Sequence, residues 1–156
     1  MAFKFKSSGV KIDSPQIANI QIEKSPIGIK TPMALGDSRS GIFAMSFDLG
    51  EQIADNFRNL LLTNRGERIG RSDFGANLRP LVSELSAGPD FESQVSSRIS
   101  AATQQYMPYI SLESFSTSFS TTNLNGMTRA DVKVIYSVPT LGISSKSVTV
   151  SIYVVG

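Results

Sequence analysis

The chain has 156 residues, of which 40% are hydrophobic and 18% are charged, and its formal net charge is +2. It contains neither cysteine nor histidine, which excludes disulfides, thiolate metal sites and histidine-based catalysis or metal binding. The basic residues form no uninterrupted patch, so we expect no nucleic-acid partner, and we expect no cofactor and no small-molecule substrate. The charged fraction is lower than usual, and serine and threonine take the place of the missing charged residues. A polar but uncharged surface of this kind is common in proteins whose surface becomes buried in an assembly.

The first zone, residues 1–46, shows no sustained helical period. It carries Pro15, Pro26 and Pro32 and short alternating segments such as Ala18–Ile22 and Ile27–Ile29. This pattern predicts an extended arm with one short strand. A structureless stretch of that length is unusual inside a compact domain, so we expect the arm to wrap a neighbouring subunit.

The start of the chain lacks the apolar core of a secretory signal, and no apolar run reaches the length of a membrane span, about 18 residues. We therefore expect a soluble protein made in a cytoplasm, with no membrane partner.

The second zone is predicted to be helical. Asp48 to Glu51 has the spacing of a capping box, in which the Asp48 side chain accepts from a first-turn amide and Glu51 reaches back. Apolar residues then recur on one helical face, at Leu49, Ile53, Phe57, Leu60 and Leu61. We expect this helix to end near Asn64, because Gly66 follows and can adopt left-handed geometry.

A loop over residues 66–77 precedes a short predicted helix around Pro80–Leu85. Gly88 and Pro89 then interrupt the chain, and Pro89 suits the first position of another helix. That helix is predicted from the spacing of its apolar residues and from the proline after them, at Phe91, Val95, Ile99, Ala102, Tyr106 and Pro108.

The third zone is predicted to be β. Residues 110–119 alternate with a phase slip at Glu113 and Ser114 that indicates a bulge, and Asn123–Gly126 is a hairpin turn signal. Two further alternating runs follow, separated by a turn over Pro139–Gly142. Their apolar positions are Ala130, Val132, Val134, Tyr136 and Val138 in the first run, and Val148, Val150, Ile152 and Val154 in the second. The sequence therefore predicts an α+β fold: an extended N-terminal arm, then two or three helices packed on one face of a small antiparallel β-meander.

The densest polar cluster is the loop from Thr63 to Gly75, which contains three glycines, three arginines and two carboxylates. Its arginines, Arg65, Arg68 and Arg71, have the chemistry to hold carboxylates or phosphates in bidentate fashion. The composition is equally that of a solvated loop in which Glu67 and Asp73 neutralise the arginines beside them.

The residues of this loop resemble a known family. The leucines at 60–62, the segment Thr63–Arg68, then Asp73–Gly75 and the leucines at 78 and 81 are similar to the motif of the gene-twenty-five-like baseplate wedge proteins of contractile phage tails. The short baseplate subunit of type VI secretion systems belongs to the same family. The resemblance covers about residues 47–156, and it departs from the family at Ser72, where many members have proline. That departure implies a less rigid loop around Arg71.

The resemblance implies a structural virion protein of the tail baseplate, made in the host cytoplasm, and not an enzyme. By this resemblance, Glu67 and Arg68 would bind the helical core of the wedge proteins, and Phe74 and Gly75 would shape the turn. The expected wedge-binding site therefore consists of Glu67, Arg68, Arg71, Phe74 and Gly75. The β-part would join strands of the first ring of tail sheath subunits, and this would start sheath assembly. We expect the last strand to bind the sheath subunits, at Val148, Val150, Ile152 and Val154.

The resemblance also defines the expected domains: residues 1–46 are the arm, and residues 47–156 are the baseplate wedge, or sheath-initiator, domain. The expected partners are wedge proteins and sheath protein, with the tail tube as a further candidate for the arm.

Two other functions are open to the same sequence. A lysozyme-like glycosidase needs two carboxylates, one of them with a raised pKa, and the candidates are Glu67, Asp73, Glu84 and Glu92. Arginines around the first two would lower both pKa values, and the chain has no tryptophan to bind a sugar chain. A regulatory adaptor of the bacterial stress response is the second alternative, because a cellular branch shares the fold and fold alone does not set function.

Overall fold

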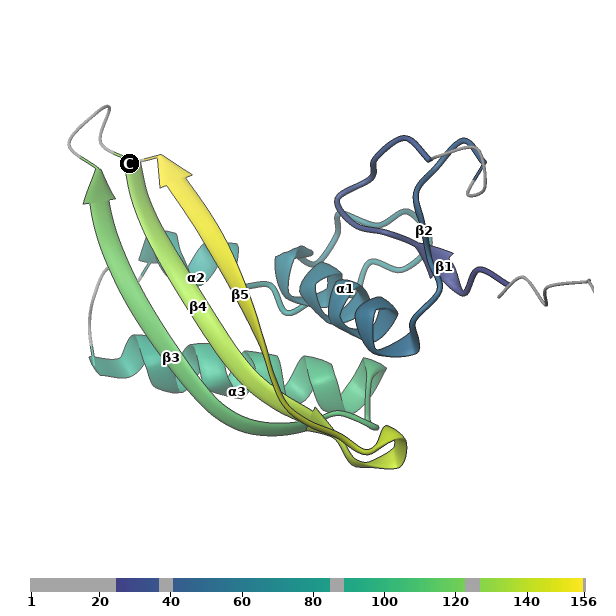
Figure 1. Ribbon diagram of the computed structural model, residues 1–156. Helices are drawn as coiled ribbons and strands as arrows, with labels where there is room; N and C mark the ends of the chain where they lie inside the picture. The colour runs from purple at the N-terminus through teal and green to yellow at the C-terminus, as the bar shows by residue number, and fades with distance from the viewer. Residues whose placement is uncertain (1–24, 37–40, 85–88, 123–126, 156) are drawn as a thin grey trace, which may run out of the picture.

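A computed structural model describes residues 25–36, 41–84, 89–122 and 127–155 of the chain. It contains a small hairpin, then three helices, then three long strands (Figure 1). In chain order the elements are β1 Gly28–Ile29, β2 Met45–Ser46, α1 Leu49–Leu62, α2 Arg79–Glu84, α3 Pro89–Tyr106, β3 Ser111–Thr122, β4 Met127–Val138, a 3₁₀ turn Pro139–Leu141 and β5 Ile143–Val155.

The three long strands form an antiparallel meander in the order β3-β4-β5. The ladder of β3 and β4 shifts register between Leu112 and Ser114, which confirms the bulge predicted at Glu113. The hairpin turn predicted at Asn123–Gly126 lies outside the described residues, although the strands on either side of it pair from Thr122 and Met127 onward. The turn after β4 is confirmed, with Gly142 in left-handed geometry (φ 64°).

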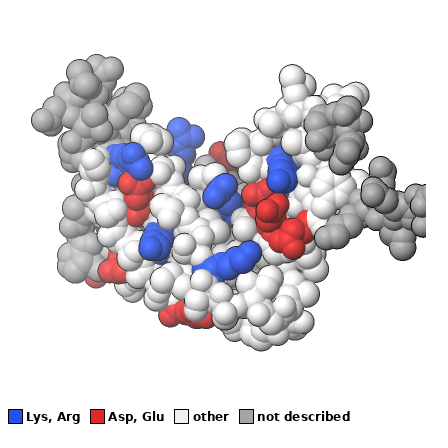
Figure 2. Space-filling model, viewed as in Figure 1, with Lys and Arg blue, Asp and Glu red and all other residues white. Residues whose placement is uncertain are grey.

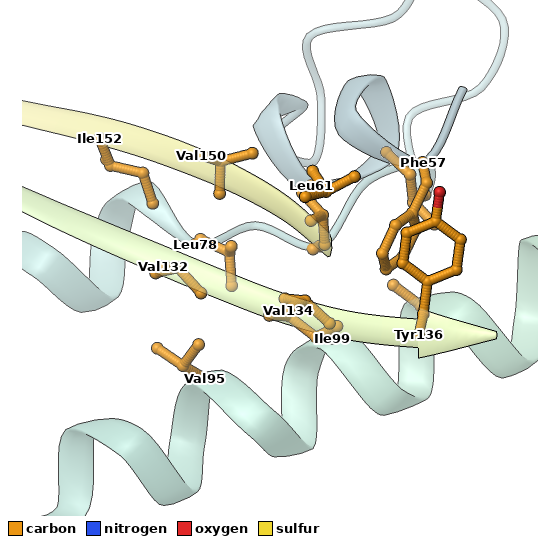
Figure 3. Close-up of a cluster of buried hydrophobic side chains, with 14 of the residues drawn as sticks. Phe57, Leu61, Leu78, Val95, Ile99, Val132, Val134, Tyr136, Val150 and Ile152 are labelled. Atoms are coloured by element: carbon orange, nitrogen blue, oxygen red, sulfur yellow. The ribbon is translucent and has the colours of Figure 1, made fainter. Parts of the chain in front are cut away.

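The core lies between one face of this sheet and the helices behind it (Figures 1 and 3). Alternate residues of β4 and β5 are buried on that face, as predicted, because side chains alternate across a strand and only one face of this sheet is covered. From the helices, the fully buried Phe57 packs edge-to-face on Tyr136, with 5.0 Å between ring centroids. The α+β class and the meander covered on one face are therefore confirmed.

Helix α1 begins where its sequence predicts. Asp48 is the N-cap, and its Oδ2 accepts a hydrogen bond from the Glu51 amide at 2.9 Å. The Glu51 carboxylate forms an ion pair with Lys30 Nζ at 3.3 Å, so this side chain ties the helix to the preceding hairpin. The helix ends at Leu62, with Thr63 as C-cap.

The other two helices also follow their predicted positions. Helix α2 covers Arg79–Glu84, one residue earlier than the predicted Pro80–Leu85, and Leu85 lies outside the described residues. Helix α3 starts at Pro89 and ends at Tyr106, two residues before Pro108.

The described part of the arm is more ordered than one isolated strand. Strands β1 and β2 pair antiparallel, Gly28 with Ser46 and Ile29 with Met45. The Thr31 amide donates to Asp55 Oδ2 of α1 at 3.0 Å, which fixes the hairpin against the helix. Residues 1–24, including Ala18–Ile22, lie outside the described residues, and the boundary at residue 46 stays a prediction.

Basic and acidic side chains are scattered over the face seen in Figure 2, with a small group of acidic side chains lying together over the region of α1. Over the described ranges, no group of three acidic side chains is placed to hold a metal ion, and no helix is long and apolar enough to span a membrane.

Candidate partner-binding sites

The loop between α1 and α2 is held by its own backbone. The Gly66 amide donates to the Ser72 carbonyl at 2.8 Å, which closes the loop across its base. Two further bonds tighten the turn, from the Arg71 amide to the Arg68 carbonyl (3.3 Å) and from the Phe74 amide to the Arg71 carbonyl (3.2 Å). Ser72, which stands where many members of the resembled family have proline, takes part in the closure through its carbonyl.

Gly75 joins this loop to the core. It is buried, its φ is +117°, and a Cβ built on it would lie 2.2 Å from the Thr63 carbonyl oxygen. The next amide, of Ala76, donates to the Leu60 carbonyl at 3.0 Å and so satisfies one of the last carbonyls of α1. The close backbone approach requires glycine, in agreement with the predicted turn-shaping role.

Glu67 folds back on the end of α1. Its carboxylate accepts from the Asn64 amide at 2.7 Å and from Asn64 Nδ2 at 2.8 Å. These hydrogen bonds, with a smaller contribution from Arg79, lower the pKa of Glu67. The Asn64 side chain accepts in turn from the Arg79 amide at 3.3 Å, so Asn64 connects Glu67 to the start of α2.

Arg68 and Phe74 lie together on the other side of the loop. The guanidinium carbon of Arg68 stands 3.8 Å from the centroid of the Phe74 ring, a cation–π distance. Phe74 packs in turn against Tyr106 of α3, with 4.9 Å between ring centroids and the ring planes tilted by 56°, and Arg71 lies 6.0 Å from the centroid of the Tyr106 ring.

Asp73 is the second carboxylate of the loop, and Tyr106 is its partner. The Tyr106 hydroxyl donates to Asp73 Oδ2 at 2.6 Å, and Gln105 Nε2 donates to the same oxygen at 3.5 Å. The bond from Tyr106 is the largest cause of the lowered pKa of Asp73, ahead of Arg71 and Arg65. The predicted direction of both carboxylate pKa values is confirmed, but hydrogen bonds and not arginines are the main cause.

Two hollows lie on either side of this loop. A groove of about 240 Å³ lies between α1, the loop and the end of β5, and its lining includes Leu61, Leu62, Asn64, Glu67, Leu78, Arg79 and Ser151–Tyr153. An aromatic cleft of about 260 Å³ is lined by Asn56, Asn59, Arg68, Phe74, Tyr106, Met107 and Tyr109. The structure thus places Glu67 in the groove and Arg68 in the cleft, although the two are neighbours in sequence.

The last strand presents its backbone, not its apolar side chains. Val148, Val150 and Ile152 are at most 8% exposed and face the helices, and Val154 pairs with Thr128 of β4. Strand β5 has β4 on one side, and none of the described residues adds a strand on its other side. A partner strand would therefore have to use the main-chain edge of β5 that no described strand pairs, and not the side chains of these residues.

Comparison with protein-family models and with curated proteins finds no match for this chain. Among solved structures, it is similar to a candidate tail lysozyme from Geobacter sulfurreducens, with 22% identity and a TM-score of 0.46 over 69% of this chain and 91% of that one. It is also similar to a chain in the baseplate of the anti-feeding prophage, with 14% identity and a TM-score of 0.48 over 80% of this chain and 82% of that one.

Proposed function

We propose that this protein is a structural component of a contractile tail baseplate, which binds wedge proteins through its α1–α2 loop and offers the edge of β5 to the first sheath subunits. The observation that carries the proposal is the loop itself. The polar residues that resemble the baseplate wedge family come together in one closed turn at the surface, on a base of buried leucines and Gly75, and β5 nearby has an edge that no described strand pairs.

The loop suits protein binding because its groups are held in place before a partner arrives. The guanidinium of Arg68 is held over the Phe74 ring, so it loses less side-chain freedom on binding a carboxylate than an unrestrained arginine would. Arg71 is exposed nearby. A helix bearing acidic residues is the chemistry that this side of the loop fits best.

The sheet edge suits strand addition. In β-augmentation, main-chain hydrogen bonds supply the affinity and register, and the free edge of β5 offers such groups. A long exposed edge is an aggregation hazard for a protein that keeps it open, and burial in an assembly removes that hazard.

Two of the four candidate carboxylates, Glu67 and Asp73, do not suit a glycosidase. A general acid of such an enzyme needs a raised pKa, whereas Glu67 and Asp73 both have lowered pKa values and exposed side chains. A regulatory adaptor would bind a different partner, so it is separated from the baseplate role by the assembly test that follows.

The test is electron microscopy of particles made with a stop codon at Gln52, with a wild-type copy supplied in trans as the control. We expect baseplates and tubes without sheath, or sheath polymerised away from baseplates, and restoration by the wild-type copy. Fully sheathed tails without this protein would refute the proposed function and direct attention to the adaptor.

A further inference from the structure

A third hollow lies where the described chain begins. It is bounded by the entry to β1, the first turns of α1, the connection from α3 to β3 and the 3₁₀ turn after β4, and we call it the entry groove. Its volume is about 400 Å³, and its lining is Ile27, Leu49, Gln52, Ile53, Asn56, Tyr109, Thr140 and Leu141. It shares no lining residue with the groove beside β5, and it contains none of the residues proposed to bind wedge or sheath proteins.

The rim of the entry groove is apolar and only partly covered. Ile53 is buried and forms part of the floor. The rim consists of four side chains that are between 40% and 49% exposed: Ile27, Leu49, Tyr109 and Leu141. These four come from separate parts of the chain, so the fold brings them together. Single exposed apolar residues are ordinary on a protein surface, but a hollow lined by several of them is typical of a surface that another segment covers.

One wall of the entry groove also holds an amide oxygen without a partner. Gln52 Nε2 donates to Asn56 Oδ1 at 3.0 Å, but Gln52 Oε1 is buried and accepts no hydrogen bond from any described residue. Buried polar atoms nearly always have a partner, so a donor is expected beside Gln52 that the described residues do not supply. A main-chain amide of an extended segment in the groove is such a donor.

The chain that precedes the entry groove supplies a matching segment. Residues 1–24 lie outside the described residues, and they join the structure at Ser25, two residues before Ile27 on the rim. Only four residues separate Ile22 from Ile27, so covalent linkage keeps the two within about 18 Å of each other. Ile20 and Ile22 are two positions apart, so an extended segment would present both side chains on one face.

We propose that the entry groove is occupied by residues 17–22 of the same chain, with Ile20 and Ile22 against the apolar rim. Linkage within one chain gives a segment so near the groove an effective concentration on the order of millimolar, above that of a second copy or a partner protein in dilute solution. This occupant differs from the neighbouring subunit expected for the arm as a whole, and it concerns only the part of the arm nearest Ser25. The inference goes beyond the proposed function and does not depend on it.

The test uses the purified full-length chain with a photoreactive benzoylphenylalanine at Leu141, on the rim of the entry groove. The matched control carries the probe at Leu62, which is similarly exposed (47% against 43%) but lines the groove beside β5. Trypsin releases the proposed segment in one peptide, residues 12–24, because it cleaves after Lys11 and Lys24. After irradiation and digestion, mass spectrometry should find this peptide linked to the Leu141 probe and not to the Leu62 probe.

Mixing equal amounts of heavy-isotope-labelled and unlabelled chains before irradiation separates the same chain from a second copy. We expect both peptides of each cross-link to carry the same label. Cross-links that join a labelled peptide to an unlabelled one would mean that a second copy fills the groove, and they would overturn the assignment. Absence of the peptide of residues 12–24 from the Leu141 cross-links would overturn it as well.

Substitutions then test the two isoleucines. The double variant Ile20→Asp with Ile22→Asp should reduce the Leu141 cross-link several-fold, because a carboxylate is costly to bury against an apolar surface. Val10→Asp, the matched control outside the proposed segment, should leave the cross-link unchanged. Undiminished cross-linking in the double variant, or an equal loss in Val10→Asp, would refute the role of Ile20 and Ile22. None of these measurements involves sheath assembly, so the stop codon at Gln52 remains a separate test of the proposed function.

Discussion

At the scale of single residues, Gly75 shows how one backbone position fixes the binding loop. Its φ of +117° is accessible mainly to glycine, and an added Cβ would overlap the Thr63 carbonyl. We expect Gly75→Ala to lower the free energy of unfolding by about 2 kcal/mol or more, measured by urea denaturation.

Gly70→Ala is the control for that experiment. Gly70 also has positive φ, at +80°, but a Cβ there would meet no atom within 4 Å. Gly70→Ala should lower the free energy of unfolding by only about 1 kcal/mol, the approximate cost of left-handed geometry alone. Equal losses for the two variants would mean that the contact with Thr63 is not what demands glycine.

The Asp73–Tyr106 hydrogen bond gives a prediction in pH. Because this bond lowers the pKa of Asp73 in the folded state, its contribution to stability is present above the unfolded pKa and is lost as pH falls through the folded pKa. Tyr106→Phe should raise the pKa of Asp73 toward its ordinary value and weaken the acid dependence of stability. An NMR titration of the Asp73 carboxyl measures the shift, with Tyr109→Phe as control. A pKa that stays equally low in Tyr106→Phe would mean that the bond from Tyr106 is not the main cause, and would leave the backbone hydrogen bond and the arginines as its causes.

The sequence predicted which residues form the loop, but not which of their side chains line the groove beside β5 and which line the aromatic cleft. Glu67 and Arg68 are adjacent, and which hollow each side chain lines depends on the closure of the loop by Gly66 and Ser72. Tyr106 was predicted only as part of a helical face. Its hydroxyl bonds to Asp73, which lies 33 residues away in the sequence. Long-range pairs of this kind leave no periodic signal in a sequence.

At the scale of elements, α1 depends on its cap. The Asp48 side chain accepts from the Glu51 amide, which otherwise has no partner within the helix. We expect Asp48→Ala to cost about 1 kcal/mol of stability and Asp48→Asn much less, because asparagine also caps helices well. Thermal denaturation of the two variants decides this, and an equal loss in both would point to the charge of Asp48 instead of its cap.

The long elements were predictable because each buries one face. A helix or strand with one covered side repeats its apolar residues every 3.6 or 2 positions, and α1, α3, β4 and β5 all show that repeat. Strands β1 and β2 were missed as a pair because each has two residues, too few for a period. Their position comes from contacts with α1, such as Lys30 with Glu51, which the sequence pattern does not contain.

At the scale of the whole molecule, the core and the arm divide the chain unequally. Among the described residues, the buried hydrophobic core residues all fall between Ile53 and Ile152, in the helices, their connections and the sheet. The hairpin of β1 and β2 contacts α1 through Lys30 and Thr31 but adds no residue to that core. The described hairpin is therefore attached to a core that is complete without it.

This division predicts opposite results for two truncations. A chain of residues 47–156 should unfold cooperatively in urea, with a modest loss of stability from the missing contacts with α1.

A chain of residues 1–147 lacks Val148, Val150 and Ile152. Burial of each of these side chains is worth about 1.5–3 kcal/mol, and the sum is comparable with the 5–15 kcal/mol total stability of an ordinary domain. We expect circular dichroism to show it unfolded. Loss of sheath from that truncation would then reflect unfolding, so the role of the β5 edge must be tested with intact chains. If residues 47–156 fail to fold, the hairpin belongs to the domain, and the boundary at residue 46 is wrong.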